Sequence, residues 1–536
     1  MNGSRRWAVL ALCAVAMVGG GQLMRRAVGG GASRTRLFDQ VLGHVERNFV
    51  DSLAEEDLYR RAARGMVREL HDPNSAVLSE RQAQRLAETT AGAYDGIGVQ
   101  VDVRDGWLSV IATLPGSPAE SAGIRAGDRI VEVDGHPVNA AAADDARRGL
   151  RGKPGTKVAL LIERPGAASR IPVTVTRAAV HVSAVRHALM LRDGVGYVQL
   201  AIFSDDAAEA LGRAVAALRA QGMRTLLLDL RGDPGGVLDQ GVAVSDEFLD
   251  RGQVVVSLRG RTALETQTFT DSSAQQWPGL LLIALTDGGT ASASEIAAGA
   301  WQDHDRAAVV GTTTYGKGSA QSLLPLVPDS GALRLTTALW FTPSGRSIQR
   351  RRRTADSVTA ADTMAEPPLS ARTAYRTDAG RVVYGGGGIT PDLVVAPQDS
   401  VDGLFVLTRA LGKDLPRFRD LVADEAAAAR AGALRGGAVT VTPAMREALW
   451  RMAQGQALHL TRAQFDSAQA AVDRMLGDEI ARQALGSEAA WRRRMESDRV
   501  VLAALELAAG AADEREVLRR AGERRAAHRE DLPGTP

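Results

Sequence analysis

The feature that most restricts the fold is an alternation of strand-like and helix-like segments over residues 180–345. Three continuous apolar runs, at residues 225–230, 254–258 and 280–285, are typical of strands that are buried on both faces. Helical stretches such as residues 206–221 lie between them. This alternation predicts an α/β domain with a largely parallel sheet, whose functional site should lie at the carboxyl ends of the strands.

The hydrophobic pattern divides the rest of the chain into further regions. Apolar residues recur at three- and four-residue steps in the N-terminal part, where a second helix is expected at residues 58–70. Short alternating strands follow, the first of them at residues 97–101. The predicted multidomain α/β fold comprises an N-terminal helical segment (37–92), a β-rich module (93–178), an α/β core with an insertion (179–398, insertion 354–381) and a C-terminal helical region (399–536).

Residues 1–36 are expected to direct export. Arg5 and Arg6 precede an uncharged run over residues 7–21, which is short for a membrane span and long enough for the core of a signal peptide. The pattern leaves open whether the segment is cleaved or stays as an anchor in the inner membrane. Either outcome predicts a periplasmic or other extracytoplasmic location for the remaining chain.

Composition excludes several classes of function. Lys and Arg number 65 against 63 Asp and Glu, and a net charge of +2 gives no electrostatic case for a nucleic-acid partner. The single cysteine, Cys13, excludes a disulfide framework and a cysteine-based metal cluster, and no histidines have the spacing of a zinc site. A catalytic base of the lysine type has only four candidates, which are Lys153, Lys157, Lys317 and Lys413.

Two turns rich in small residues follow two of the apolar runs. Residues 226–236 read Leu-Leu-Leu-Asp-Leu-Arg-Gly-Asp-Pro-Gly-Gly. Their glycines allow backbone N–H groups to converge on one point and bind an oxyanion. The alternative is that the glycines only form a tight turn. Residues 286–296 place Ser292 at a second strand-to-helix turn. Such a turn exposes a nucleophile beside an oxyanion hole, although Ser292 alone also fits a helix N-cap.

A third segment, residues 311–321, reads Gly-Thr-Thr-Thr-Tyr-Gly-Lys-Gly-Ser-Ala-Gln. It nearly matches a phosphate-binding loop, but Gly318 replaces the hydroxyl residue that would hold Mg²⁺. The other interpretation makes Lys317 a general base, because flanking glycines would bury the amine and favour its neutral form. His304 is the only histidine near these segments, and beside Asp303 it is expected to be a surface or structural residue.

In these segments the chain resembles the carboxyl-terminal processing, or tail-specific, serine peptidases. The matching motifs are Leu-Asp-Leu-Arg-x-x-Pro-Gly-Gly (228–236), Thr-Ala-Ser-Ala-Ser-Glu (290–295), Gln-Asp-His (302–304), Tyr-Gly-Lys-Gly-x-x-Gln (315–321), Pro-Ser-Gly-Arg (343–346) and Gly-Ile-Thr-Pro-Asp (388–392). Their order and spacing agree over residues 37–397. The resemblance implies a Ser292 nucleophile, a Lys317 base oriented by Gln321, and oxyanion donors from the Ala293 N–H and from either Gly235 or Gly236. Asp233 departs from the family, which usually has Asn there.

The β-rich module resembles a PDZ domain, which these peptidases carry. Its Gly-Ile-Gly-Val segment at residues 96–99 matches the loop that holds a peptide's terminal carboxylate through backbone N–H groups, here those of Ile97, Gly98 and Val99. A bulky side chain at Gly98 is expected to close that loop. The alternative is a structural β module without a ligand.

The resemblance implies an exported serine endopeptidase that recognises polypeptides by free, apolar C-terminal tails and needs no metal, nucleotide or other cofactor. A second copy of the chain or an adaptor protein is a further candidate partner. The alternative from another class is a non-catalytic PDZ scaffold with a peptidase-like domain, against which the intact Ser292, Lys317 and Gln321 argue. A third hypothesis is a nucleotide-binding protein that uses residues 311–317.

Overall fold

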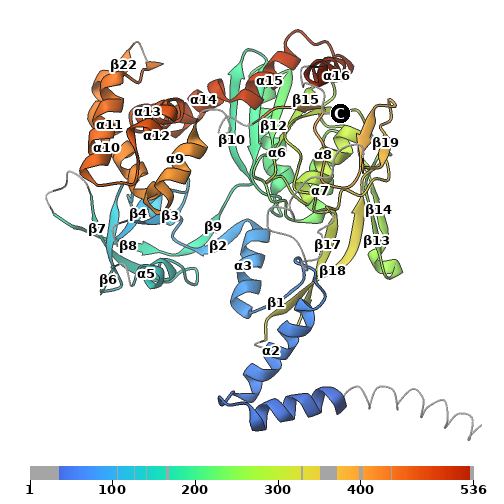
Figure 1. Ribbon diagram of the computed structural model, residues 1–536, viewed down its shortest axis with the longest axis horizontal. Coiled ribbons are helices and arrows are strands. Elements are labelled where there is room, and N and C mark those ends of the chain that lie inside the picture. The colour runs from blue at the N-terminus through green and yellow to red at the C-terminus, as the bar shows by residue number, and fades with distance from the viewer. Residues whose placement is uncertain are drawn as a thin grey trace, which may run out of the picture. The chain divides into compact units, whose positions relative to one another are not determined.

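The computed structural model in Figure 1 describes residues 36–104, 107–125, 127–139, 142–164, 167, 169–327, 330–350, 371–396, 403–435 and 438–530. The expected export segment, except residue 36, and the insertion up to residue 370 lie outside the described residues. Within the described ranges, no helix is both long and apolar enough to cross a membrane. The chain divides into two compact units, residues 1–81 with 321–336 and residues 82–320 with 337–536.

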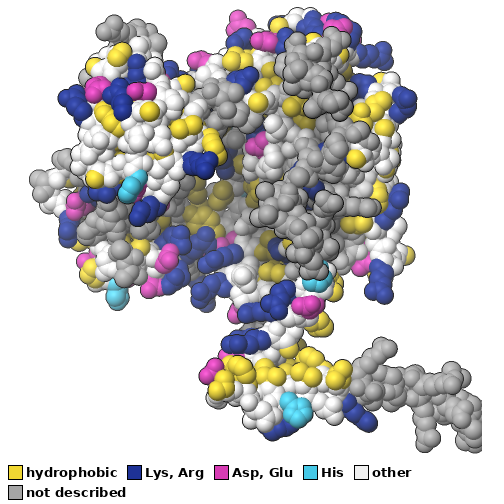
Figure 2. All heavy atoms as spheres, viewed as in Figure 1, with side chains coloured by type: hydrophobic (Ala, Val, Ile, Leu, Met, Phe, Trp, Pro, Cys, Tyr) yellow, Lys and Arg dark blue, Asp and Glu magenta, His cyan; other side chains and the backbone are white. Residues whose placement is uncertain are grey.

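The first unit contains the N-terminal helices and a small antiparallel sheet. Helix α2 (Glu55–Arg68) begins three residues before the predicted start, because three consecutive acidic residues suit the positive end of a helix, and it ends two residues early. Strand β1 (Ala76–Leu78) pairs with the first residues of β18 (Ala332–Phe341), and β17 (Ser319–Pro325) also pairs with β18. Residues 36–48 are helical, and Figure 2 shows apolar side chains gathered along their surface.

The second unit begins within α3 (Glu80–Ala91) and continues into the β-rich module. The module's antiparallel sheet has the order β3 (Val99–Arg104), β4 (Trp107–Thr113), β5 (Arg129–Val133), β7 (Lys157–Glu163), β8 (Ile171–Thr176), with β6 (His136–Pro137) paired to β5. Two short helices, α4 (Pro118–Ser121) and α5 (Ala143–Gly149), complete it. The strand predicted at residues 97–101 is confirmed from Val99 onward, where β3 begins two residues later than predicted. The left-handed Gly98 (φ 79°) separates β3 from β2 (Ala93–Gly96), which pairs with β9 (Ala178–His181).

A six-stranded sheet forms the centre of the α/β core, as predicted. Its order is β10 (Val185–Arg192), β11 (Val195–Leu200), β12 (Thr225–Asp229), β15 (Leu281–Thr286), β16 (Ala307–Gly311), β21 (Leu393–Val394). Strands β11 to β21 are parallel, and only the β10–β11 pair is antiparallel. The predicted sheet is therefore confirmed as largely parallel.

Helices cover both faces of this sheet. Side chains such as Leu226 and Leu228 pack in the cluster that contains α6 (Ala207–Ala220), α7 (Leu238–Asp246) and α8 (Ala293–Asp303). The alternate side chains, such as Leu227, pack with α15 (Arg499–Ala508) and α16 (Glu514–Glu530), as the two-residue period of a strand requires. The last helices of the chain thus share a hydrophobic core with the sheet.

The apolar run at residues 254–258 does not join the parallel sheet, so that prediction is wrong. It lies in β13 (Val254–Gly260), which pairs antiparallel with β14 (Gln267–Thr270) and with the end of β18. Burial alternates in its second half, where Ser257 and Arg259 are more exposed than Leu258. A short apolar run alone does not reveal which sheet a strand enters.

The earlier C-terminal helices have a core of their own. They are α9 (Leu404–Leu411), α10 (Leu415–Ala433), α11 (Pro443–Gly455), α12 (Arg462–Ser467) and α13 (Gln469–Leu485), and the buried residues of their shared cluster include Phe418, Leu449 and Phe465. Helix α14 (Ser487–Ser497) then leads to α15 on the central sheet. A hairpin of β19 (Ala374–Arg376) and β20 (Val382–Tyr384) lies earlier in the chain.

Candidate active site

Ser292 lies at the strand-to-helix turn between β15 and α8, as predicted, with a backbone that serine rarely adopts. Its φ of 59° and ψ of −117° lie outside the regions favoured by residues with a side chain. The turn after β12 packs directly against it. A Cβ atom on Gly235 would lie 2.4 Å from the Ala291 carbonyl oxygen and 2.8 Å from the Ser292 Cβ, so only glycine permits this approach. The structure therefore brings Gly235, Ser292 and Ala293 together.

A buried glutamate joins the serine turn to the lysine segment. The Glu295 carboxylate accepts the N–H groups of Ser292 and Lys317 on one oxygen, Oε2, each at 2.9 Å. Its other oxygen accepts the Gly316 N–H at 2.7 Å and the Thr314 hydroxyl at 2.5 Å. Because both backbone nitrogens lie 2.9 Å from the same oxygen atom, Ser292 and Lys317 are close together in space. Burial raises the pKa of Glu295, and these hydrogen bonds oppose the shift.

Glu295 lies in one of the family motifs, but the sequence alone does not reveal its contacts with both segments. The available signal was an acidic residue three positions after a serine at a helix start, which is the spacing of a capping box. Here the glutamate does accept the N-cap N–H, as in that motif. Its further bonds to the lysine segment come from residues about twenty positions later, which local spacing does not reveal.

Lys317 is partly buried, and its flanking glycines are needed for packing. A Cβ at Gly316 would lie 3.0 Å from the Gly388 nitrogen, and one at Gly318 would lie 2.9 Å from the Gln349 nitrogen. Strand β17 follows this segment, whereas a phosphate-binding loop leads into a helix. The nucleotide-binding hypothesis for residues 311–317 is therefore wrong.

Asp233 is fully buried in the turn after β12. Its carboxylate accepts the Gly235 N–H at 2.8 Å, and its carbonyl oxygen accepts the Ala291 N–H at 2.9 Å and the Ser294 hydroxyl at 3.2 Å. Burial raises the pKa of Asp233 to about 7, and the hydrogen bond from the Gly235 N–H opposes the shift. The Gly235 N–H is thus engaged within the turn itself.

The remaining predicted residues near the site have other surroundings. Gln321 belongs to the first unit, where its side-chain amide donates to the Thr336 hydroxyl at 3.2 Å. His304 bonds through Nδ1 to the Asp378 carboxylate at 2.7 Å and through Nε2 to the Val254 carbonyl at 2.8 Å, which is a structural role, as expected. In the part of the chain that the structure describes, no cluster of His, Cys, Asp and Glu could hold a metal ion.

The predicted tail-binding loop lies next to α4, at the edge of the module's sheet. The carbonyl of Ile97 accepts the Ala119 N–H at 2.8 Å, and that of Gly98 accepts the Leu114 N–H at 2.9 Å. Val99 then opens the edge strand β3. A Cβ on Gly98 would lie 2.3 Å from the Ser117 Cβ, so a bulky residue there would disrupt the loop and not merely close it.

Comparisons with known proteins identify the family and the two domains. Residues 194–359 match the model of peptidase family S41, and residues 110–164 match a PDZ domain. A carboxy-terminal-processing protease of Bartonella bacilliformis is 35% identical over 316 residues, which cover 58% of this chain and 72% of the relative. The chain belongs to the carboxy-terminal processing proteases. This family consists of serine peptidases, so the chain is an enzyme of that class.

Other members of the carboxy-terminal processing proteases give similar matches. The protease CtpA of Bacillus subtilis is 30% identical over 329 residues, covering 61% of this chain and 70% of its own. The solved structure of a photosystem II D1 C-terminal processing protease is 30% identical, covers 58% of this chain and 83% of its own, and has a TM-score of 0.35. The assignment to the family rests on the sequence relatives.

Asp233→Asn is expected to stabilise this processing protease most at alkaline pH. Because the pKa of Asp233 is raised from 3.8 to about 7, the folded protein keeps a proton that the unfolded chain loses. The free energy of unfolding therefore falls as the pH rises through this interval. Asn keeps an acceptor for the Gly235 N–H and does not titrate. Thermal melts should show a larger Tm advantage of the variant at pH 8 than at pH 5, and an equal advantage at both would contradict the titration.

Glu295→Gln is expected to lower kcat by about ten- to a hundredfold with little change in KM. The family resemblance implies that Ser292 and Lys317 react, and small displacements of reacting groups are costly. An amide offers one acceptor oxygen where the carboxylate offers two, so the four bonds that join the Ser292 turn to residues 314–317 cannot all persist. A matched control is Glu247→Gln, which changes another buried carboxyl, bonded to the Trp277 Nε1 at 2.9 Å. The measurement is peptidase kinetics on an unfolded reporter protein. An equal loss of kcat in both variants would refute the role of Glu295 in positioning Ser292 and Lys317.

Proposed function

We propose that the protein is an exported endopeptidase that acylates Ser292, uses Lys317 as its base, and selects polypeptides by free, apolar C-terminal tails. The observation that carries this proposal is the Glu295 carboxylate, which bonds the backbone of both residues. Membership of the carboxy-terminal processing proteases supports the reaction class. The names of the relatives and the pattern of residues 1–36 support the substrate and the export, respectively.

In the proposed mechanism the Ser292 hydroxyl attacks the carbonyl carbon of the scissile bond while the Lys317 amine takes the hydroxyl proton. The resulting ammonium then protonates the departing amine, and an acyl group remains on Ser292. Lys317 next removes a proton from water, which attacks the acyl-enzyme, and the ammonium returns that proton to Ser292 Oγ as the second product leaves. Gln321 would orient the lysine amine. All proton transfers use side chains of this chain, so the scheme requires no metal and no cofactor.

The oxyanion of the tetrahedral intermediate would be held by the Ala293 N–H and the Gly236 N–H. Ala293 is the first residue of α8, where N–H groups are unpaired within the helix and the helix dipole favours negative charge. Of the two glycines, Gly236 is preferred because the Gly235 N–H is donated to Asp233. Removing one donor from such a site typically costs about a hundred- to a thousandfold in kcat.

Tail recognition is proposed for the PDZ-like module. Its edge strand β3 can accept an added peptide strand, and residues 97–99 lead into that strand, where backbone N–H groups can hold a terminal carboxylate. We propose an adaptor protein or a second copy of the chain as a further binding partner. A non-catalytic scaffold would bind the same tails without cutting them, so degradation of an unfolded reporter with an apolar C-terminus separates the two functions.

Ser292→Ala, Lys317→Ala and Lys317→Arg are each expected to abolish cleavage of that reporter without loss of folding. Nucleophile and base act as one unit, so losing either should cost about as much as losing both. A guanidinium does not release its proton at neutral pH, which makes the arginine variant inactive. Lys413→Arg, at an exposed residue of the C-terminal region, is the matched control and should keep full activity. Substantial activity in Lys317→Arg would exclude Lys317 as the base.

Amidation of a peptide's C-terminus is expected to weaken its binding roughly ten- to a hundredfold, which is the loss of one charge-assisted contact. The measurement is fluorescence anisotropy with matched free and amidated peptides and the inactive Ser292→Ala protein. This design avoids Gly98, where a side chain would disturb the module. Equal affinities would eliminate recognition by residues 97–99 and leave the proposed dyad unaffected.

A further inference from the structure

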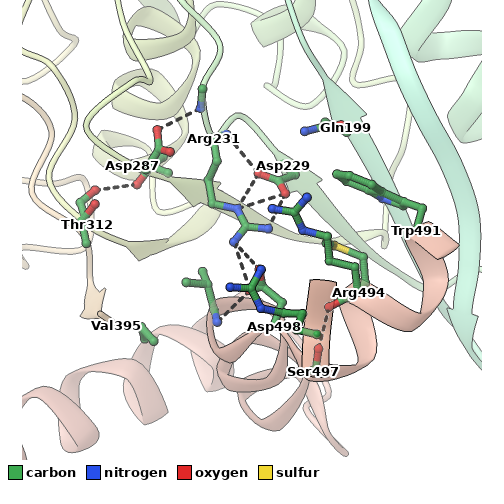
Figure 3. A pocket seen from close by; sticks show the side chains of 15 residues that line it. Gln199, Asp229, Arg231, Asp287, Thr312, Val395, Trp491, Arg494, Ser497 and Asp498 are labelled. Atoms are coloured by element: carbon green, nitrogen blue, oxygen red, sulfur yellow. Dashed lines mark hydrogen bonds and ion pairs between the residues drawn. The ribbon is translucent and has the colours of Figure 1, made fainter. Parts of the chain in front are cut away.

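An ion pair connects the turn at residues 231–236, called here the oxyanion turn, to the C-terminal helices (Figure 3). Arg231, two residues after the end of β12, donates through Nη1 to both carboxylate oxygens of Asp498 at 3.0 and 2.8 Å. Its Nε and Nη2 donate to Asp229 at 2.9 and 2.6 Å. The guanidinium thus lies between two carboxylates, one at the end of β12 and the other at the start of α15.

Both carboxylates are themselves fixed. Asp498 is the N-cap of α15, where it accepts the Val500 N–H at 2.9 Å and the Val501 N–H at 3.0 Å. Val501 is fully buried against the face of the central sheet. Asp229 accepts the hydroxyl of the buried Tyr197 at 2.7 Å. Arg231 is therefore held from two sides by groups that are anchored to the sheet.

The position of Arg231 determines where the oxyanion turn begins. The next residue, Gly232, donates its N–H to Asp287 at 2.9 Å, and Asp287 belongs to the turn that carries Ser292. Gly235, which packs against Ser292, follows four residues after Arg231, and Gly236 comes next. A shift of Arg231 would thus be transmitted to the Gly236 N–H through a short and tightly bonded segment.

We infer that Asp498 is a positioning residue of the peptidase, which holds the oxyanion turn in place through Arg231. The C-terminal helices, which lie beyond the residues matched by the S41 family model, thereby contribute to catalysis. Asp498 touches neither substrate nor reacting atoms. It acts on the turn whose oxyanion role is part of the proposed function, so the inference rests on that proposal.

The test separates positioning from helix capping. Asp498→Asn keeps a good N-cap residue and removes the charge that faces Arg231. Asp498→Glu restores the charge, and the cavity of about 250 Å³ that both residues line leaves space for the extra methylene group. Glu514→Gln is the matched control: it breaks another ion pair between the tail and the core, Arg306–Glu514 at 2.9 Å, at the opposite end of the parallel strands.

Two readouts are needed. On the unfolded reporter, Asp498→Asn should lose about ten- to a hundredfold in kcat with KM within about twofold, Asp498→Glu should recover part of it, and Glu514→Gln should keep the wild-type kcat. Hydrogen–deuterium exchange should rise over residues 231–236 in Asp498→Asn and stay unchanged there in Glu514→Gln.

The outcomes also separate this inference from the proposed function. One outcome combines faster exchange in residues 231–236 of Asp498→Asn with a wild-type protein that cuts no substrate. It would support the positioning of the turn by Asp498, called here the tether, and would refute the proposed function. An active wild type with unchanged kcat and unchanged exchange in Asp498→Asn would overturn the tether. Equal losses of kcat in Asp498→Asn and Glu514→Gln would overturn it as well, because they would indicate a general loss of tail packing.

Discussion

The Glu295 carboxylate is fully buried in the first turn of α8, and the arrangement of the candidate site depends on it. A carboxylate removed from water is costly unless hydrogen bonds replace its hydration, and here four donors do so. Those donors are the N–H groups of Ser292, Gly316 and Lys317 and the hydroxyl of Thr314. Because the donors belong to two loops after adjacent parallel strands, satisfying the buried charge forces those loops together.

The strained backbone of Ser292 becomes understandable in this setting. Its N–H must reach Glu295 while its Cβ lies close to Gly235, and the turn after β12 is bonded to the serine turn independently. Asp287 accepts the N–H groups of Gly232 and Gly289, and the Thr290 hydroxyl donates to the Leu230 carbonyl at 2.8 Å. The many bonds on either side fix a conformation that the serine alone would not adopt.

The sequence predicted the features that local patterns encode. The placement of Ser292 and of the glycines of residues 232–236 at strand ends follows from apolar runs that stop at small residues, and a largely parallel sheet follows from their alternation with helices. The assignment of residues 254–258 failed because hydrophobicity does not specify a strand's partner. The roles of Glu295 and Asp498 were missed for a related reason: their partners lie about twenty and 267 positions away, and no local spacing marks such contacts.

The C-terminal helices illustrate how a covering element becomes part of a site. A parallel sheet needs helices on both faces, and in this chain α6, α7 and α8 supply one layer. Leu227, Ile283 and Val310 point to the other face and are buried together with Val501 and Leu507 of α15. Helix α15, which covers this face, begins near the carboxyl ends of the strands. Its N-cap residue, Asp498, therefore meets Arg231 there. The physical need to cover the sheet thus brings a carboxylate to the one edge where a parallel α/β domain places its chemistry.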